Sequence, residues 1–306
     1  MKELKKLATS FLCTALLGAL LTIAGPASPA AAATTKVVRY GPYTIPAATD
    51  TGPGMIHNAI QPLVQKPCAE CYITSFTPDL VYEDGSRATM DNGAMLHHAV
   101  FASAFRRDAT CGGTWLGLLG QRFFATGNER TVAALPDGYG YRVHWYDWWN
   151  LLADLMNMDS TSKTVYVQVT YTYRQAWEPV KEVTPAWLDI DQCGDSEYSI
   201  PAGFSDTHYD WKVNVPGQLV SMLGHVHGHG IAVEARNESR GGKSICRSEA
   251  TLDPNDVHSV LSMSTCVGDP VATLRYGQTV RLHSEYQSAH AASDVMGIML
   301  GYIYRQ

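Results

Sequence analysis

The sequence has little of what marks nucleic-acid-binding, helical or membrane-spanning proteins. Its 23 basic and 29 acidic residues give a formal net charge of −6, and it contains no basic block, so we expect no nucleic-acid partner. Sustained helical periodicity is scarce, which argues against a helical bundle. Beyond residues 7–25, no apolar run is long enough to span a bilayer.

The N-terminus has the pattern of an export signal. "MKELKK" is a basic start, "LATSFLCTALLGALLTIAG" is an apolar run, and "PASPAAAATT" supplies small residues for cleavage near Ala33. We expect residues 1–33 to be a signal peptide and the mature chain, 34–306, to be secreted or otherwise extracytoplasmic. No membrane partner is then expected after cleavage; an uncleaved anchor is the alternative.

The cysteines predict disulfide bonds. Cys13 lies in the signal, which leaves an even set in an exported chain. "CAEC" (68–71) could instead be a metal or redox pair. Pairing cannot be read from the sequence, although proximity favours Cys246 with Cys266. The six cysteines outside the signal are Cys68, Cys71, Cys111, Cys193, Cys246 and Cys266.

The apolar pattern has a period of two over most of the chain. In "TVYVQVTYTYR" (164–174) valines and tyrosines alternate with threonine and glutamine, as in a half-buried strand. We expect an all-β protein with two antiparallel jelly-roll-like β-sandwich domains in tandem, 34–180 and 181–306. The polar, proline-bearing stretch 174–185 is the expected linker. Residues 145–158 could form a helix or a strand.

The stretch "GHVHGHG" (224–230) predicts a metal site. Alternate residues of a strand share a face, so His225 and His227 lie about 7 Å apart along it. Imidazole suits zinc, copper, nickel or iron, and the pattern does not choose among them. His229 continues the row, but the glycines beside it indicate that the strand ends or bends there. A polar strand face with solvated histidines is the alternative.

Two further features carry candidate ligands. His97 and His98 are adjacent, so in a regular strand they face opposite sides; both reach one metal only if the backbone is irregular or the site lies at a sheet edge. Met296, downstream of His290, starts the last expected strand. Such a methionine is usually a core residue, but as a thioether ligand it would point to copper, particularly Cu(I).

The order of four motifs resembles a known family. "LHHAVF", "LPDGYGYRV", "GHVHGHG" and "HAASDVM" resemble the copper type II, ascorbate-dependent monooxygenases, the family of peptidylglycine alpha-hydroxylating monooxygenase and dopamine beta-monooxygenase. The resemblance implies two jelly-roll-like domains facing each other across a cleft, with one copper on each. It implies a catalytic copper on His225, His227 and Met296, with His290 nearby.

The same resemblance implies an electron-transfer copper on His97, His98 and a third histidine. Where the family has that histidine, this chain has Thr170, a poor copper ligand. His144 and Met156 are candidate substitutes. His229 is left as a bystander or a residue supporting the ligands.

The expected substrate also departs from the peptide-amidating members. The positions that hold a peptide carboxylate there match Leu223, Ile298 and Leu300 here, all apolar. A carboxylate buried against them would lack partners at a cost of several kcal/mol. We expect no amidation of glycine-extended peptides and an apolar substrate pocket at these residues.

The sequence supports three hypotheses. The first is a copper-dependent monooxygenase that hydroxylates a C–H bond of a small, fairly apolar substrate with O2 and a reductant such as ascorbate. It would use one copper; whether a second copper binds at His97 and His98 is not decided by the sequence. The second is an exported, non-catalytic copper-binding protein that retains one site, and the third is a structural or adhesion protein without metal. The sequence predicts no oligomeric state.

Overall fold

The computed structural model describes residues 32–112, 120–257 and 259–306. The expected signal peptide lies almost wholly outside these residues. Ala33–Gln306 form one compact unit by their contacts. Within the described residues, no helix has the length and apolar character needed to cross a membrane.

The described chain is built almost entirely of β-strands, which confirms the all-β prediction. Two 3-10 helices, η1 (Met90–Asn92) and η2 (Glu238–Arg240), interrupt the strands. The strands are β1 (Thr34–Ile45), β2 (Gly54–Val64), β3 (Cys71–Tyr82), β4 (Ala94–Ser103), β5 (Gln121–Gly127), β6 (Ala133–Ala134), β7 (Tyr139–Val143), β8 (Trp149–Asn157), β9 (Lys163–Gln175), β10 (Lys181–Asp189), β11 (Glu197–Ile200), β12 (Gly203–Lys212), β13 (Gly217–Val226), β14 (Gly230–Asn237), β15 (Lys243–Leu252), β16 (Val260–Met263), β17 (Thr265–Leu274), β18 (Thr279–Ser288) and β19 (Ala292–Tyr304).

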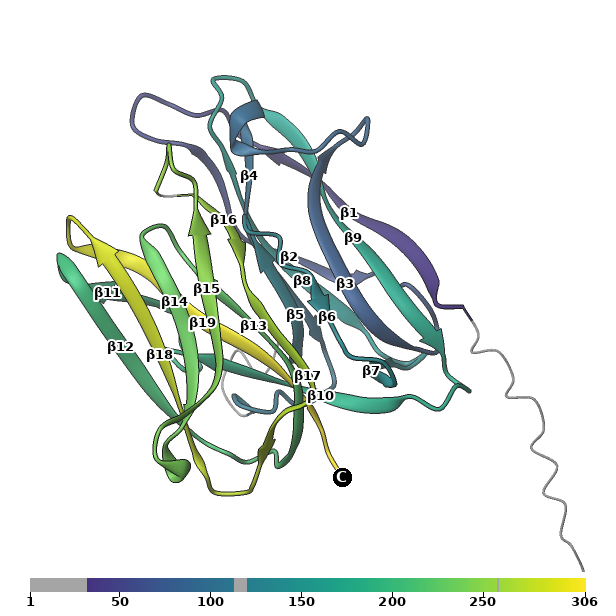
Figure 1. The fold of residues 1–306 in the computed structure, drawn as a ribbon. Coiled ribbons are helices and arrows are strands. Elements are labelled where there is room, and N and C mark those ends of the chain that lie inside the picture. Colours follow the sequence, from purple (N-terminus) through teal and green to yellow (C-terminus); the bar gives the residue numbers. More distant parts are fainter. Residues whose placement is uncertain (1–31, 113–119, 258) are drawn as a thin grey trace, which may run out of the picture. The chain divides into compact units, whose positions relative to one another are not determined.

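The strands form three sheets (Figure 1). A 4-stranded sheet has the order β2-β8-β4-β5, and a 5-stranded sheet has the order β12-β18-β14-β15-β16. The largest sheet runs β1-β9-β3-β7-β10-β19-β13-β17, and β10 joins β7 in parallel at Lys181 and Glu182. Hydrogen bonds thus cross the expected boundary between residues 180 and 181. The division into two jelly-roll-like domains stays a prediction.

Apolar alternation explains the strands. In β9 the side chains of Val165, Val167, Val169 and Tyr171 are fully buried, while the residues between them are half-buried. The ambiguous run 145–158 resolves as strand β8, because its burial alternates with a period of two from Trp149 to Asn157. A helix would have buried residues three or four apart instead.

Strands β13 and β19 contribute to two hydrophobic clusters. Leu223 and Leu300 belong to a first cluster that is otherwise formed largely by strands of residues 38–187. Met222 and Met299, their neighbours in sequence, belong to a second cluster of residues 186–303. Successive side chains of a strand point to opposite faces, so His225, two residues after Leu223, points toward the first cluster as Leu223 does.

Three disulfides link the six cysteines: Cys68–Cys71, Cys111–Cys193 and Cys246–Cys266. The pairing of Cys246 with Cys266 is confirmed, and "CAEC" closes on itself as a disulfide. Three disulfides indicate an oxidising, extracytoplasmic environment.

Loop length predicts which disulfide stabilises the fold most. Cys111 and Cys193 are 82 residues apart, whereas Cys68 and Cys71 are 3 apart. Loop-closure entropy gives about 4.5 kcal/mol for the long loop and about 1.6 kcal/mol for the short one. We therefore expect Cys111→Ser/Cys193→Ser to lose roughly three times as much unfolding free energy as Cys68→Ser/Cys71→Ser. Urea denaturation of both double variants checks this, and equal losses would contradict it.

Candidate metal centre

A β-bulge in β4 places two adjacent histidines on one side of the strand. In the pairing of β4 with β8, Leu96 lies opposite Leu155 and His98 opposite Asp154, so His97 has no partner of its own. This extra residue shifts the alternation by one. Leu96 and Ala99 therefore face the core on either side of the bulge, while His97 and His98 are both half-buried on the other face. The irregular backbone that adjacent ligands require is present.

The second pair comes from the end of β13. Val226 is buried in the second hydrophobic cluster, so His225 and His227 point away from that cluster. Tyr286 fixes the end of the strand, because its hydroxyl accepts a hydrogen bond from the backbone N–H of His227 at 2.8 Å and donates one to the carbonyl of Met296 at 2.6 Å. His229 adopts a left-handed conformation with φ of 66° in the turn that follows.

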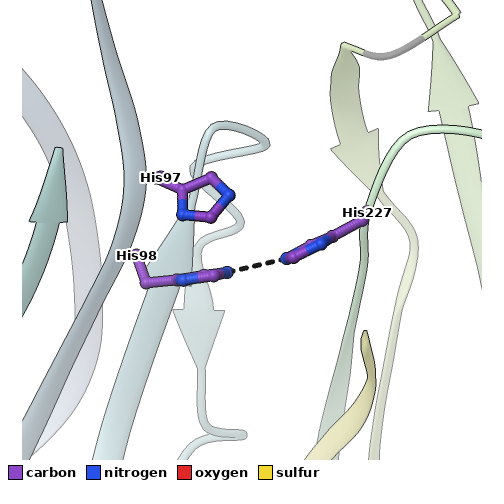
Figure 2. Close-up of side chains that lie close together, drawn as sticks. All are labelled: His97, His98 and His227. Carbon is purple, nitrogen blue, oxygen red and sulfur yellow. Dashed lines mark hydrogen bonds between the residues drawn. The ribbon is translucent and has the colours of Figure 1, made fainter. Parts of the chain in front are cut away.

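The two pairs meet. Nε2 of His98 lies 2.9 Å from Nε2 of His227 and 3.2 Å from Nε2 of His225. His97, His98 and His227 each offer a ring nitrogen, and these nitrogens lie within 4.8 Å of one another. Figure 2 shows His97 and His98 projecting from one strand toward His227 on the opposite segment. We call His97, His98, His225 and His227 the histidine cluster.

The outer nitrogens of two rings are held by hydrogen bonds. Nδ1 of His227 donates to the carbonyl oxygen of Asp294, and a carbonyl can only accept, so Nε2 of this ring carries the lone pair. Nδ1 of His225 donates to Glu129 Oε1 at 3.1 Å. Nδ1 of His98 has the carboxylate of Asp154 at 3.6 Å, beyond hydrogen-bond distance. Such outer partners orient metal-binding imidazoles.

Burial favours the neutral form of His97, His98 and His227, which is the form that binds metal. It is the largest cause of the lowered pKa of His97, His98 and His227, and repulsion from neighbouring histidines lowers each pKa further. For Glu129, burial opposes ionisation. Attraction to His225 and hydrogen bonds from that ring and from the Gly127 N–H outweigh it, so the pKa of Glu129 is lowered.

The cluster fits a metal ion better than it fits hydrogen bonding alone. Nε2 of His98 has at most one proton to donate, so it can satisfy only one of the two facing lone pairs. A metal ion would instead accept a lone pair from Nε2 of each of the three rings, His98, His225 and His227. Nδ1 of His97 is buried and has no hydrogen-bond partner among the described residues, a cost that a fourth metal bond would remove.

A mostly apolar cavity of about 200 Å³ opens beside the cluster. We call it the apolar cavity. All three expected pocket residues, Leu223, Ile298 and Leu300, line it, as do Met296, His98 and His225. Met296 is 7% exposed. The structure thus brings the expected pocket and the expected thioether to the same space as the histidines.

A second cavity, of about 590 Å³, also lies against the histidine cluster. His97, His225 and His227 line it, together with Met156. His229 and His290 also line this cavity, but His290 is exposed. Neither is among the histidines whose ring nitrogens converge.

Two expectations about ligands differ from the arrangement in the structure. His144 follows β7, where its ring stacks on Tyr146 and lies near Glu70, and it lines neither cavity. The structure therefore places His144 apart from the histidine cluster. The resemblance also implied separate coppers on the two histidine pairs, whereas His98 contacts His225 and His227 directly. Thr170 lies on β9, paired with Val37 and Thr77, and lines neither cavity.

Sequence reasoning missed the acidic residues that support the rings. Glu129 and Asp154 sit in "TGNERT" and "LLADLMN", which have no recognisable ligand spacing. Alternation along β8 could have placed Asp154 on the half-buried face with Met156. Nothing local in the sequence indicates that Glu129 reaches His225, 96 residues away.

Comparison with known proteins identifies the family. A family model described as "Stress up-regulated Nod 19" (SURNod19) matches residues 124–305, more than half of the chain. The chain belongs to the SURNod19 family. The SURNod19 match begins in β5 and includes His225 and His227, but not His97 and His98.

Two fungal proteins are related to this SURNod19 chain. It is 30% identical to the "Probable copper-dependent oxygenase M1" of Phoma sp., over 100% of this chain and 83% of the relative. It is 27% identical to the "Probable copper-dependent oxygenase clz3" of Cochliobolus lunatus, over 74% and 77%. The SURNod19 chain thus falls in a copper-oxygenase-like family. Neither name is that of an ascorbate-dependent monooxygenase, so that part of the resemblance stays a proposal.

Among solved structures, the major capsid protein P2 of bacteriophage PM2 matches with a TM-score of 0.34 and 9% identity. The match covers 89% of this chain and 97% of that one. A likeness this remote carries no argument about function.

The contact between Glu129 and His225 generates a prediction. Glu129→Gln keeps an acceptor but removes the carboxylate charge that faces Nδ1 of His225, so we expect about 10-fold weaker copper binding. Competition with a chromophoric chelator measures the affinity. Glu70→Gln is the matched control, because Glu70 faces His144 outside the cluster. Equal effects of the two changes would contradict the role of Glu129.

Proposed function

We propose that the protein is a copper-dependent oxygenase with one copper site shared by the two halves of the chain. His98, His225 and His227 would hold the ion through Nε2, with His97 as a fourth ligand. The observation that carries this proposal is the convergence of ring nitrogens from β4 and β13 at 2.9 and 3.2 Å. Imidazole alone does not select copper; the names of the two fungal relatives support that choice.

Bound copper would supply the one-electron chemistry that lets O2 react with a C–H bond, at the expense of a reductant such as ascorbate. The chain's own residues do the positioning. Glu129 and the Asp294 carbonyl fix two rings so that Nε2 faces inward. Leu223, Ile298 and Leu300 would bind an apolar substrate next to His98 and His225 and keep water away from it.

We keep Met296 as a proposed thioether ligand. It lines the apolar cavity beside His98 and His225, and a soft thioether favours Cu(I). X-ray absorption of the Cu(I) protein tests this assignment. A copper–sulfur signal in the wild type should disappear in Met296→Leu and persist in Met156→Leu; the reverse result would transfer the role to Met156.

Copper stoichiometry separates one shared site from two separate sites. For a shared site we expect one copper per wild-type chain and loss of most copper in both His98→Ala and His225→Ala. His144→Ala should keep its copper and serves as the control. Elemental analysis after reconstitution measures this. Two coppers in the wild type, with one left in each single variant, would refute the shared site.

Oxygen consumption tests catalysis. The copper-loaded protein should consume O2 with ascorbate in the presence of small apolar substrates, and His225→Ala should not. Full copper occupancy without substrate-dependent O2 uptake would favour the non-catalytic copper-binding alternative.

We also propose that residues 1–33 direct export and are removed, which N-terminal sequencing of the secreted protein checks.

A further inference from the structure

The apolar cavity contains one polar feature that the proposed oxygenase does not explain. Arg122, on β5, lines the cavity and is 5% exposed. Its Nη2 is buried and has no hydrogen-bond partner among the described residues. An unsatisfied buried donor costs free energy, and this one belongs to a side chain that lines the space where we place the substrate.

The guanidinium is held in one orientation. Its Nε donates to Asp108 Oδ2 at 2.8 Å, and its plane lies over the ring of Trp187, with Cζ 4.6 Å from the ring centroid. Asp108 is 2% exposed and also accepts hydrogen bonds from the backbone N–H groups of Thr110 and Cys111. Arg122 is therefore a fixed donor.

Charge decides what kind of acceptor fits. Asp108 already neutralises Arg122, which is the only Lys or Arg among the described residues that line the cavity. Glu129, Asp154 and Asp195 line the same cavity. Apart from a copper ion on the histidine cluster, the described lining offers no cation that is not already paired, so a carboxylate at Arg122 would add uncompensated charge. A neutral carbonyl oxygen would satisfy Nη2 without adding charge.

We propose that Arg122 is a substrate-binding residue that donates a hydrogen bond to the carbonyl oxygen of an apolar ketone, ester or amide. This inference rests on the proposed function. Arg122 pairs with Ala102 on β4, and His98 precedes Ala102 by four residues, about 13 Å along the strand. The substrate would be elongated, with its carbonyl at Arg122 and its reacting C–H bond near the histidine cluster.

Three matched probes test the proposal: 2-nonanone, its methylene isostere 2-methyl-1-nonene, and octanoate. Binding to the purified chain is measured with and without copper. The ketone should bind about 10-fold tighter than the alkene, which corresponds to about 1.4 kcal/mol, and octanoate should bind more weakly than the ketone. In Arg122→Lys, the shorter side chain keeps the ion pair with Asp108 but places no donor at the position of Nη2, so the ketone preference should disappear while alkene binding persists.

Arg106→Lys is the control, because Arg106 pairs with Asp147 and does not line the cavity. It should keep the ketone preference. Equal binding of ketone and alkene to the wild type, no binding of either, a preference that survives in Arg122→Lys, or tighter binding of octanoate would each overturn the proposal. Copper content measured in parallel separates the two ideas: a ketone preference in a chain that binds no copper would refute only the proposed oxygenase.

Discussion

The site depends on one contact, the approach of His98 Nε2 to the Nε2 atoms of His225 and His227. Two local features of β4 and β13 direct the rings toward this contact. The bulge at His97 places two adjacent imidazoles on one face of β4. Val226 is buried in the second hydrophobic cluster, so His225 and His227 point away from that cluster. Because β13 and β19 contribute to both hydrophobic clusters, packing on either side of these strands fixes the position of His225 and His227.

Two cavities of different polarity adjoin the histidine cluster. On one side, Leu223, Ile298 and Leu300 make a cavity suited to apolar molecules, with Arg122 as a fixed donor in its wall. On the other side, Met156, His229 and His290 line a larger cavity of more polar character. Since imidazoles of the cluster line both, an ion held there would contact two environments at once, one suited to substrate and one open to polar co-reactants.

The period-two pattern was enough to predict the β fold, because a half-buried strand needs alternating side chains and β9 has them. It also predicted that His225 and His227 share a face. The convergence of this pair with His97 and His98 could not be predicted, since it depends on a bulge and on contacts between residues more than a hundred positions apart. The resemblance assigned the two histidine pairs to separate sites, whereas the structure brings His98 next to His225 and His227. A motif gives the type of ligand and not the distance between ligands.

The long sequence separation within the histidine cluster has a consequence for when the proposed metal site would form. His98 lies 127 residues before His225 and 129 before His227, so the complete ligand set exists only after β13 has docked beside β19 and against the first hydrophobic cluster. During synthesis, His97 and His98 would offer two adjacent imidazoles and nothing more. A metal ion held by this ligand set would therefore be captured only by the finished fold, and the maturing chain would not retain whichever ion it met first.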